Sequence, residues 1–408
     1  MKKLILLFQV SIFFLTLPNT YPQGGWISQQ SGTTEVLFGV SFMDANNVTA
    51  VGSFGKIIKS TDGGISWVAQ TSTVGDGLRS VFYVDVNNGI SVGDFNSIIK
   101  STNGGTNWIF QTSGTSSFLN SVSFTDPNTG TAVGWDGTII RTTNGGTDWI
   151  SQSSGTTNTL YGVSFTDANH GTVVGDGGLI LRTTDGGTTW NTQSSGTTSN
   201  LNSVTFTDVN TGTAVGAYST ILRTTDGGVN WTSQTSGVQG VFYDVSFSDA
   251  DNGTAVGNGG VIVRTINGGA NWTSQSSGTT LRLFGVSFTD SNNGIIVGED
   301  GIILTTSTGG TSVNQISSEI PERISLYPNY PNPFNPTTTI RFAINEPGLA
   351  ILKIYDVLGN EVETLVSEEK LAGEYEVEFN GDALTSGVYF YQLKANLFNQ
   401  TNKMLLMK

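Results

Sequence analysis

Short runs of β-branched and aromatic residues, separated by turns rich in glycine, threonine and asparagine, follow one another along residues 26–312. In one unit the apolar runs cover residues 119–124, 131–134 and 138–142, and a fourth run starts at Trp149. Alternation over so few positions, bounded by turn residues, predicts β-strands joined by hairpins. We therefore expect each unit to form an antiparallel sheet of four strands.

The units repeat with a fixed period. Seven tryptophans stand 41 residues apart: Trp26, Trp67, Trp108, Trp149, Trp190, Trp231 and Trp272. The next step of the period falls on Val313. A period of about 40 residues that is rich in turn and β-branched residues predicts a β-propeller in which each unit is one blade. The expected fold class is all-β, with a seven-bladed propeller over residues 24–312.

The order of the runs predicts how the ring closes. Each outer strand begins at a tryptophan, and the one at Trp26 precedes every inner strand. It must therefore complete the seventh blade, whose other three strands come from about residues 281–306. This 3+1 clasp ties the two ends of the propeller together and leaves no open blade. It also explains why the eighth copy of the repeat ends in Val313 instead of a tryptophan.

A turn of constant pattern precedes six of the tryptophans, and its first copy reads Ser60-Thr61-Asp62-Gly63-Gly64-Ile65-Ser66-Trp67. It resembles the Asp-box, Ser-x-Asp-x-Gly-x-Thr-Trp, of sialidase-type (BNR) repeats. The Val-Gly-x-x-Gly element before it resembles the photosystem II assembly factor branch of that group. In these families the boxes lie away from the active face, and an Asp or Asn here can bond nearby backbone N–H groups. We interpret the box residues as structural: Asp62, Asn103, Asn144, Asp185, Asp226 and Asn267.

The two-residue bend between the second and third strands varies among units that are otherwise near copies. These bends should share a face with the Ser-Gly-Thr-Thr crossovers between blades, opposite the Asp-boxes, and converge toward the mouth of the central channel. Aromatic rings beside carboxylates suit sugar binding, because ring faces stack on C–H surfaces and carboxylates accept hydroxyl hydrogen bonds. A protein-contact patch and simple drift at turn positions are the alternatives. The candidate ligand-binding residues are Phe54, Phe95, Trp135, Tyr218, Asp94, Asp136, Asp176, Glu299 and Asp300.

Catalysis is a separate hypothesis, since sialidases share the box. The arginine cluster and the Phe-Arg-Ile-Pro motif of that family are absent, and Glu35 and Glu299 are the only glutamates of the propeller. A glycoside hydrolase that uses two of Asp94, Asp136 and Asp176 on successive blades is the alternative function. We assign no catalytic residue, and we expect no cofactor. We also expect no metal site, because the single histidine, His170, has no second histidine to complete one.

Six cations recur at the end of the third strand: Lys59, Lys100, Arg141, Arg182, Arg223 and Arg264. The first turn of each blade carries a repeated aspartate on the same side, such as Asp126 and Asp167. We expect structural ion pairs and hydrogen bonds between the two sets. A basic rim for an anionic partner is the alternative.

The N-terminus has the pattern of an exported protein. Lys2 and Lys3 precede an apolar run over residues 4–17, which is short for a membrane span and typical of a signal peptide, here placed at residues 1–22. The chain has no cysteine, so neither a disulfide framework nor a lipoprotein anchor is expected. We expect no membrane span after signal cleavage.

The repeat stops at residue 312, residues 313–325 read as a linker, and residues 326–408 carry strand patterns over 338–343, 350–355 and 387–394. Short strands with turn signals predict a small β-sandwich. The segment 327–336, rich in Pro and Asn, together with 352–359, 386–391 and 403–408, closely resembles the C-terminal sorting domain of the type IX secretion system. That resemblance implies export through the outer membrane of a Bacteroidota-like Gram-negative bacterium, with the type IX machinery as partner and the product secreted or left on the cell surface.

Charge excludes one class of partner. Residues 24–318 hold 20 acidic and 9 basic residues, so a nucleic-acid ligand is not expected. The function that the sequence favours is a monomeric, secreted or cell-surface propeller that binds a glycan or a protein, or that has a structural role.

Overall fold

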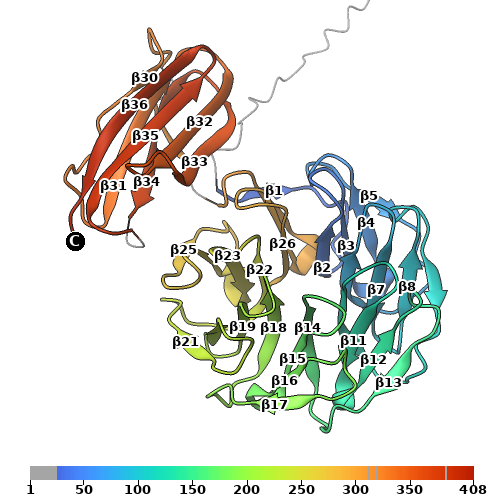
Figure 1. The fold of residues 1–408 in the computed structure, drawn as a ribbon. Helices are drawn as coiled ribbons and strands as arrows, with labels where there is room; N and C mark the ends of the chain where they lie inside the picture. The colour runs from blue at the N-terminus through green and yellow to red at the C-terminus, as the bar shows by residue number, and fades with distance from the viewer. Residues whose placement is uncertain (1–24, 311–312, 318, 382–383) are drawn as a thin grey trace, which may run out of the picture.

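A computed structural model describes residues 25–310, 313–317, 319–381 and 384–408. Residues 25–310 form seven sheets of four antiparallel strands arranged in a ring (Figure 1). This confirms the predicted propeller, and the seven sheets are consistent with the seven predicted blades. The predicted signal peptide, residues 1–22, lies outside the described residues. Within the described ranges, no helix has the length and hydropathy to cross a membrane.

One blade shows the plan of all seven. Its strands run outward from the channel in chain order as β10 (Leu119–Phe124), β11 (Gly130–Gly134), β12 (Ile139–Thr142) and β13 (Ile150–Gln152). A short 3-10 turn, η2 (Trp135–Gly137), forms the bend between β11 and β12. The same bend is helical in four other blades, as η1 (Ser53–Gly55), η3 (Asp176–Gly178), η4 (Asn258–Gly260) and η5 (Glu299–Gly301).

The other complete blades follow the same order. They are β2–β5 (Leu37–Phe42, Val48–Gly52, Ile57–Ser60, Val68–Gln70), β6–β9 (Leu78–Tyr83, Gly89–Gly93, Ile98–Ser101, Ile109–Gln111), β14–β17 (Leu160–Phe165, Gly171–Gly175, Ile180–Thr183, Asn191–Gln193), β18–β21 (Leu201–Phe206, Gly212–Gly216, Ile221–Thr224, Thr232–Gln234) and β22–β25 (Phe242–Phe247, Asn252–Gly257, Ile262–Ile266, Thr273–Gln275).

The seventh blade is closed by the N-terminal strand, as predicted. Strand β1 (Ile27–Gln29) pairs with β28 (Ile303–Thr306), which follows β26 (Leu283–Phe288) and β27 (Gly294–Gly298). Trp26 packs edge-on against the Phe288 ring, with centroids 5.9 Å apart, and its Nε1 donates to Gln275 Oε1 at 2.8 Å. The clasp therefore joins the blade both by backbone pairing and by a partly buried aromatic contact.

Blades pack face to face through apolar side chains. One such cluster joins Val133 and Ile139 of one blade to Leu160, Val163 and Val173 of the next, and all five are buried. Strand β11 is buried along its whole length because neighbouring blades cover both of its faces. The hydrophobic effect thus acts between blades, and a single blade could not bury these faces alone.

The Asp-box turns lie on the opposite face from the bends and have a structural role in this fold. Asp62 accepts hydrogen bonds from the Ser66 N–H at 2.9 Å, the Ser66 hydroxyl at 2.6 Å and the Ser60 hydroxyl at 2.7 Å. These bonds, led by the one from the Ser66 hydroxyl, lower the pKa of Asp62 to about 2. Asn144 accepts the equivalent Asp148 N–H at 2.9 Å, which explains why Asp and Asn interchange in the box.

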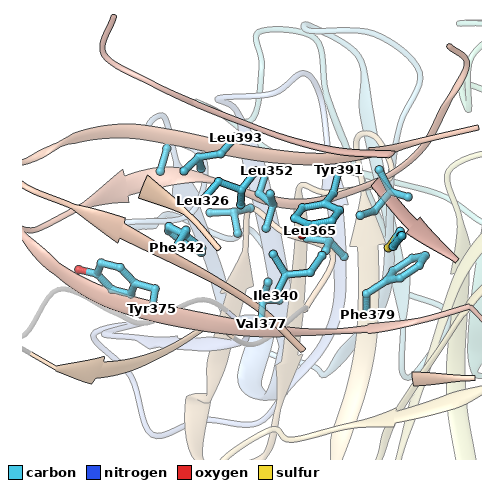
Figure 2. Packing of buried hydrophobic residues seen from close by; sticks show 14 of the residues in the cluster. Leu326, Ile340, Phe342, Leu352, Leu365, Tyr375, Val377, Phe379, Tyr391 and Leu393 are labelled. Carbon is cyan, nitrogen blue, oxygen red and sulfur yellow. The ribbon is translucent and has the colours of Figure 1, made fainter. Parts of the chain in front are cut away.

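The C-terminal module is a sandwich of two four-stranded sheets. One contains β29 (Val313–Ser317), β34 (Gly373–Asn380), β31 (Thr337–Ile344) and β30 (Ser325–Leu326), and the other contains β33 (Glu361–Lys370), β32 (Gly348–Tyr355), β35 (Gly387–Ala395) and β36 (Phe398–Leu406). Figure 2 shows the core between them, where Phe342 and Tyr375 of the first sheet face Leu352, Tyr391 and Leu393 of the second.

The predicted linker, residues 313–325, is wrong at both ends. Strand β29 pairs with β34, from Val313 opposite Val377 to Ser317 opposite Glu374, and Ser325 pairs with Ala343. The error has a physical reason, because a short edge strand is held by backbone hydrogen bonds to its neighbour and needs no hydrophobic alternation of its own. Only residues 318–324 connect these two strands.

Candidate functional site

The bends and the crossovers share one face of the propeller, as the sequence analysis expected. The Trp135 N–H donates to the Phe118 carbonyl at 3.0 Å, where Phe118 ends the crossover that enters the blade. On the other side of the bend, a Cβ atom at Gly137 would collide with the backbone oxygen of Thr156 in the following crossover. The bend is therefore wedged between two crossovers, and its side chains are presented by a rigid frame.

Aromatic residues occupy backbone positions where they are unfavourable. The second bend residue has a left-handed conformation, with φ of 55° at Phe54, 48° at Phe95 and 54° at Tyr218. Gly177 and Gly259 hold the equivalent position in two other blades. Glycine, Asn and Asp are favoured in this region, and a bulky side chain costs about 1–2 kcal/mol there. Random sequence variation at this turn would be expected to keep glycine, Asn or Asp. The aromatic residues at three of the seven bends therefore need another explanation.

These aromatic side chains are also open to solvent. The exposed fractions are 77% for Phe54, 62% for Phe95, 47% for Trp135 and 84% for Tyr218. Exposed apolar rings gathered on one face are unusual for a surface that is otherwise rich in Ser, Thr and Asn.

Three of the five predicted carboxylates are bound by neighbours. Arg79 reaches Asp94 through Nε at 2.8 Å and Nη2 at 3.0 Å. The Tyr161 hydroxyl donates to Asp176 at 2.9 Å. Desolvation, and then this hydrogen bond, raise the pKa of Tyr161 to about 12, so the hydroxyl keeps its proton.

Glu299 is the third bound carboxylate. It accepts from the Arg282 backbone N–H at 2.8 Å and from Arg282 Nε at 2.7 Å. Those bonds, the backbone one first, lower the pKa of Glu299. Asp136 and Asp300 make no side-chain hydrogen bond within the described ranges. Both have positive φ and line open polar grooves beside crossovers.

Sequence reasoning missed a second ring of variable residues. It lies at the centre of the propeller on the side of the bends, a place that we call the channel mouth. Every inner strand has a β-bulge after its first residue, for example between Leu78 and Ser80, so the intervening residue leaves the ladder. The bulged residues are Phe38, Arg79, Asn120, Tyr161, Asn202, Tyr243 and Phe284. Comparing the repeats would have found them, since this position also varies, but the bulge itself has no sequence pattern.

The face carries two aromatic groups, one built around the crossover residue Phe118 and one formed by three of the bulged residues. Phe118 lies between Phe95, at a centroid distance of 4.8 Å, and Trp135, at 4.6 Å with planes inclined by 24°. The second group joins Phe284 to Phe38 at 5.5 Å and to Tyr243 at 5.0 Å. Of the predicted bend residues, the structure thus brings Phe95 and Trp135 together through Phe118. Within the part of the chain that is described, Phe54 and Tyr218 make no ring contact.

The repeated cations bind neighbouring blades and do not form a free basic rim. Arg182 donates to Thr172 of its own blade at 2.8 Å and to the Val209 carbonyl of the next at 2.8 Å, and it lies 5.0 Å from the Phe206 ring centroid. Lys59 and Lys100 reach glycine carbonyls of the next blade at 2.6 Å. The expected ion pairs with the turn aspartates do not form among the described residues. Those aspartates instead accept hydrogen bonds from their own turns, as Asp126 does from Asn128.

No cluster of potential metal ligands occurs among the described residues. His170 contacts Asp167 in its own turn, with Nδ1 2.8 Å from Oδ2. The groups available for binding on the face of the bends and crossovers are thus aromatic rings, hydroxyl groups, amides and a few carboxylates.

Comparison with known families agrees with both resemblances. Residues 147–235 and 230–326 match the family described as photosynthesis system II assembly factor YCF48, and residues 328–407 match the secretion system C-terminal sorting domain. No curated protein matches the chain in sequence.

Solved structures resemble the propeller. YCF48 bound to D1 peptide is 20% identical, covers 72% of this chain over 100% of its own length and gives a TM-score of 0.61. YCF48 from Cyanidioschyzon merolae is 21% identical over 69% of this chain and 98% of its own, with a TM-score of 0.59. The Niastella koreensis GH74 enzyme is 14% identical over 78% of this chain and 59% of its own, with a TM-score of 0.58. At these identities the likeness establishes the fold alone.

Proposed function

We propose that this chain, which joins a propeller of the YCF48-like repeat family to a type IX secretion sorting domain, is an extracellular binding module. The sorting domain places the protein outside a Gram-negative cell, secreted or on the outer surface. The propeller then meets ligands of the extracellular space, and the face that carries the bends and crossovers is the surface that binds them.

One observation carries the proposal: Phe54, Phe95 and Tyr218 are exposed aromatics held in the left-handed region. Each lowers the stability of its turn relative to glycine or asparagine. Strained residues persist where function compensates for the strain, and exposed aromatic residues are typical anchors of binding surfaces. A ligand that packs on these rings would explain why all three positions carry an aromatic residue.

A glycoside hydrolase remains the second candidate, favoured by two observations. Asp136 and Asp300 have no side-chain partner among the described residues, and the fold is shared with the GH74 enzyme. Against it, Asp94 and Asp176 are committed to Arg79 and Tyr161. An acid and a base at defined separation are needed for glycoside hydrolysis, and engaged carboxylates serve that role poorly.

The test uses residues 24–408 and a triple variant, Phe54→Asn, Phe95→Asn and Tyr218→Asn. Asparagine tolerates the left-handed conformation, so the variant should fold at least as stably as the parent. We expect retention on extracellular ligands, screened as immobilised polysaccharides and surface proteins, to fall in the variant. Equal retention would contradict the proposal, and release of reducing ends that Asp136→Asn abolishes would favour the hydrolase.

A further inference from the structure

We infer that the ligand is an uncharged glycan chain that rests at the channel mouth, with the contiguous rings of Phe95, Phe118 and Trp135 as its main contact. The inference rests on the proposed function and makes its ligand class specific. Four features support it: a preorganised aromatic platform, arginines that are already neutralised, an excess of carboxylates on the face, and uncharged amide acceptors at the channel mouth.

The platform spans two blades. Phe95 belongs to the bend after β7, Trp135 to the bend after β11, and Phe118 to the crossover between them. Phe118 is half-buried between the other two, whose outer surfaces remain exposed to 62% and 47%. The platform thus offers ring surface to a sugar, whose C–H face packs on aromatic rings.

The platform is fixed before any ligand arrives. Asn96 donates from Nδ2 to the Thr115 carbonyl at 2.9 Å, which ties the first bend to the crossover. Thr138 donates to the Ser117 hydroxyl at 2.9 Å and the Trp135 N–H to the Phe118 carbonyl at 3.0 Å, which tie the crossover to the second bend. A rigid platform lowers the entropic cost of binding, which matters for weakly interacting ligands such as sugars.

The two arginines at the channel mouth are each neutralised by a carboxylate of the protein. Arg79 forms a bidentate pair with Asp94 and lies 4.4 Å above the Phe38 ring. Arg282 pairs with Glu299 at 2.6 Å and lies 5.8 Å from the Phe284 ring. An acidic polysaccharide or a phosphorylated ligand would have to displace an internal carboxylate to reach either guanidinium.

The rest of the face is acidic. Its bends, crossovers and bulged positions contain Lys56, Arg79 and Arg282 as the cations, against Glu35, Asp76, Asp94, Asp136, Asp176, Glu299 and Asp300. Such a balance repels polyanions. It leaves a basic peptide as the competing ligand class, yet three of these seven carboxylates are already bound by Arg79, Tyr161 and Arg282.

Uncharged acceptors complete the mouth. Asn120 and Asn202 each donate from Nδ2 to the carbonyl of a neighbouring inner strand, at 2.8 Å and 2.7 Å. The hydrogen bond made by Nδ2 fixes the orientation of each side-chain amide. The amide oxygen can then accept a hydrogen bond from a sugar hydroxyl. Aromatic faces combined with neutral acceptors suit a ligand that is rich in both C–H and O–H groups.

The experiment measures retention of residues 24–408 by affinity electrophoresis in gels that contain neutral polysaccharides (glucans, mannans and xylans), acidic ones (alginate and polygalacturonate) or none. Binding of a basic peptide, oligo-lysine, is followed by fluorescence anisotropy. Trp135→Ala is compared with Ile150→Ala, an equally apolar, 68% exposed residue on the outer strand of the same blade. We expect retention by at least one neutral polysaccharide, weakened about tenfold by Trp135→Ala and unchanged by Ile150→Ala.

Asp94→Asn adds a second readout, the selectivity between neutral and acidic polysaccharides. This selectivity would not change if Asp94 had only a structural role. It releases Arg79 from its carboxylate, so the variant should gain retention by alginate or polygalacturonate that the parent lacks. If the parent binds oligo-lysine or an acidic polysaccharide through Trp135 and no neutral one, the inference is overturned while the binding function stands. If no ligand is retained, or if both alanine variants behave alike, the glycan inference fails, and the screen with immobilised surface proteins and the triple asparagine variant then decides the binding function.

Discussion

Arg79 and Asp94 form a bidentate pair across the first and second strands of one blade, with N–O distances of 2.8 Å and 3.0 Å. The pair joins a bulged channel residue to a bend residue, so it connects the two rings of variable side chains on the binding face. The pair also limits what each residue can do. A carboxylate held in this way is a poor catalytic group, and the arginine that it neutralises is a poor receptor for anions.

Replacing Trp26 with alanine should destabilise the whole propeller. Trp26 carries the edge contact to Phe288 and the hydrogen bond to Gln275 that lock the clasp. Trp26 is partly buried, so its removal should lower the free energy of unfolding by about 3 kcal/mol, the lower end of the range for buried tryptophans. Urea denaturation followed by far-UV circular dichroism measures the loss. A variant as stable as the parent would show that the clasp contributes little.

Relieving the left-handed strain should stabilise the protein. Phe54→Gly removes a Cβ from a position with φ of 55°, so we expect the free energy of unfolding to rise by about 1 kcal/mol. Gly177→Ala is the matched reverse change, since it adds a Cβ at φ 65° where no atom lies within 4 Å of it, and it should cost a similar amount. If Phe54→Gly lowers the melting temperature instead, Phe54 is held by packing and its strain is not functional.

Asp62→Asn should be tolerated and Asp62→Ala should not. Asn103 and Asn144 already fill the same box position and accept the same backbone hydrogen bonds. Alanine leaves the Ser66 and Ser60 donors without their acceptor, which costs about 1 kcal/mol per lost bond at most, because water reaches this turn. Thermal denaturation of both variants decides the matter, and equal losses would contradict the role given to the box.

Asp244 should make stability fall as pH rises from about 4 to 6. Its side chain lies between inner strands, where it accepts from the Ser203 hydroxyl at 2.7 Å and the Val286 N–H at 2.9 Å. Desolvation raises the pKa of Asp244 to about 6, above the value of 3.8 expected without it. The folded protein therefore holds this proton when the unfolded chain has lost it, so the contribution is complete below pH 4 and lost above 6.

The control for that prediction is Asp244→Asn, which cannot ionise. Other carboxylates have lowered pKa values and act in the opposite direction below pH 4, so the difference between variant and parent isolates Asp244. Relative to the parent, the asparagine variant should gain about 1–3 kcal/mol between pH 4 and pH 7, measured by urea denaturation. A difference that does not change with pH would show that the carboxyl titrates normally.

The repeat by itself determined the blade count, the clasp and the family resemblances. A 41-residue period repeated over seven tryptophans leaves one way to bury the blade faces, and the unpaired first outer strand leaves one way to close the ring. Variation among near-identical repeats also identified Phe95 and Trp135 as site candidates. These properties depend on local pattern and on counting, so they can be read from the chain alone.

Only the tertiary structure decided which of the variable side chains meet. The β-bulge that turns Arg79 and Phe38 toward the mouth, the position of Phe118 between two bends and the pairing of Arg79 with Asp94 all depend on geometry between strands and blades. The same holds for β29, whose place in the sandwich is set by backbone pairing to β34. Sequence pattern records which residues are buried or exposed, whereas contacts between separate strands depend on twist, register and bulges, which leave no period in the chain.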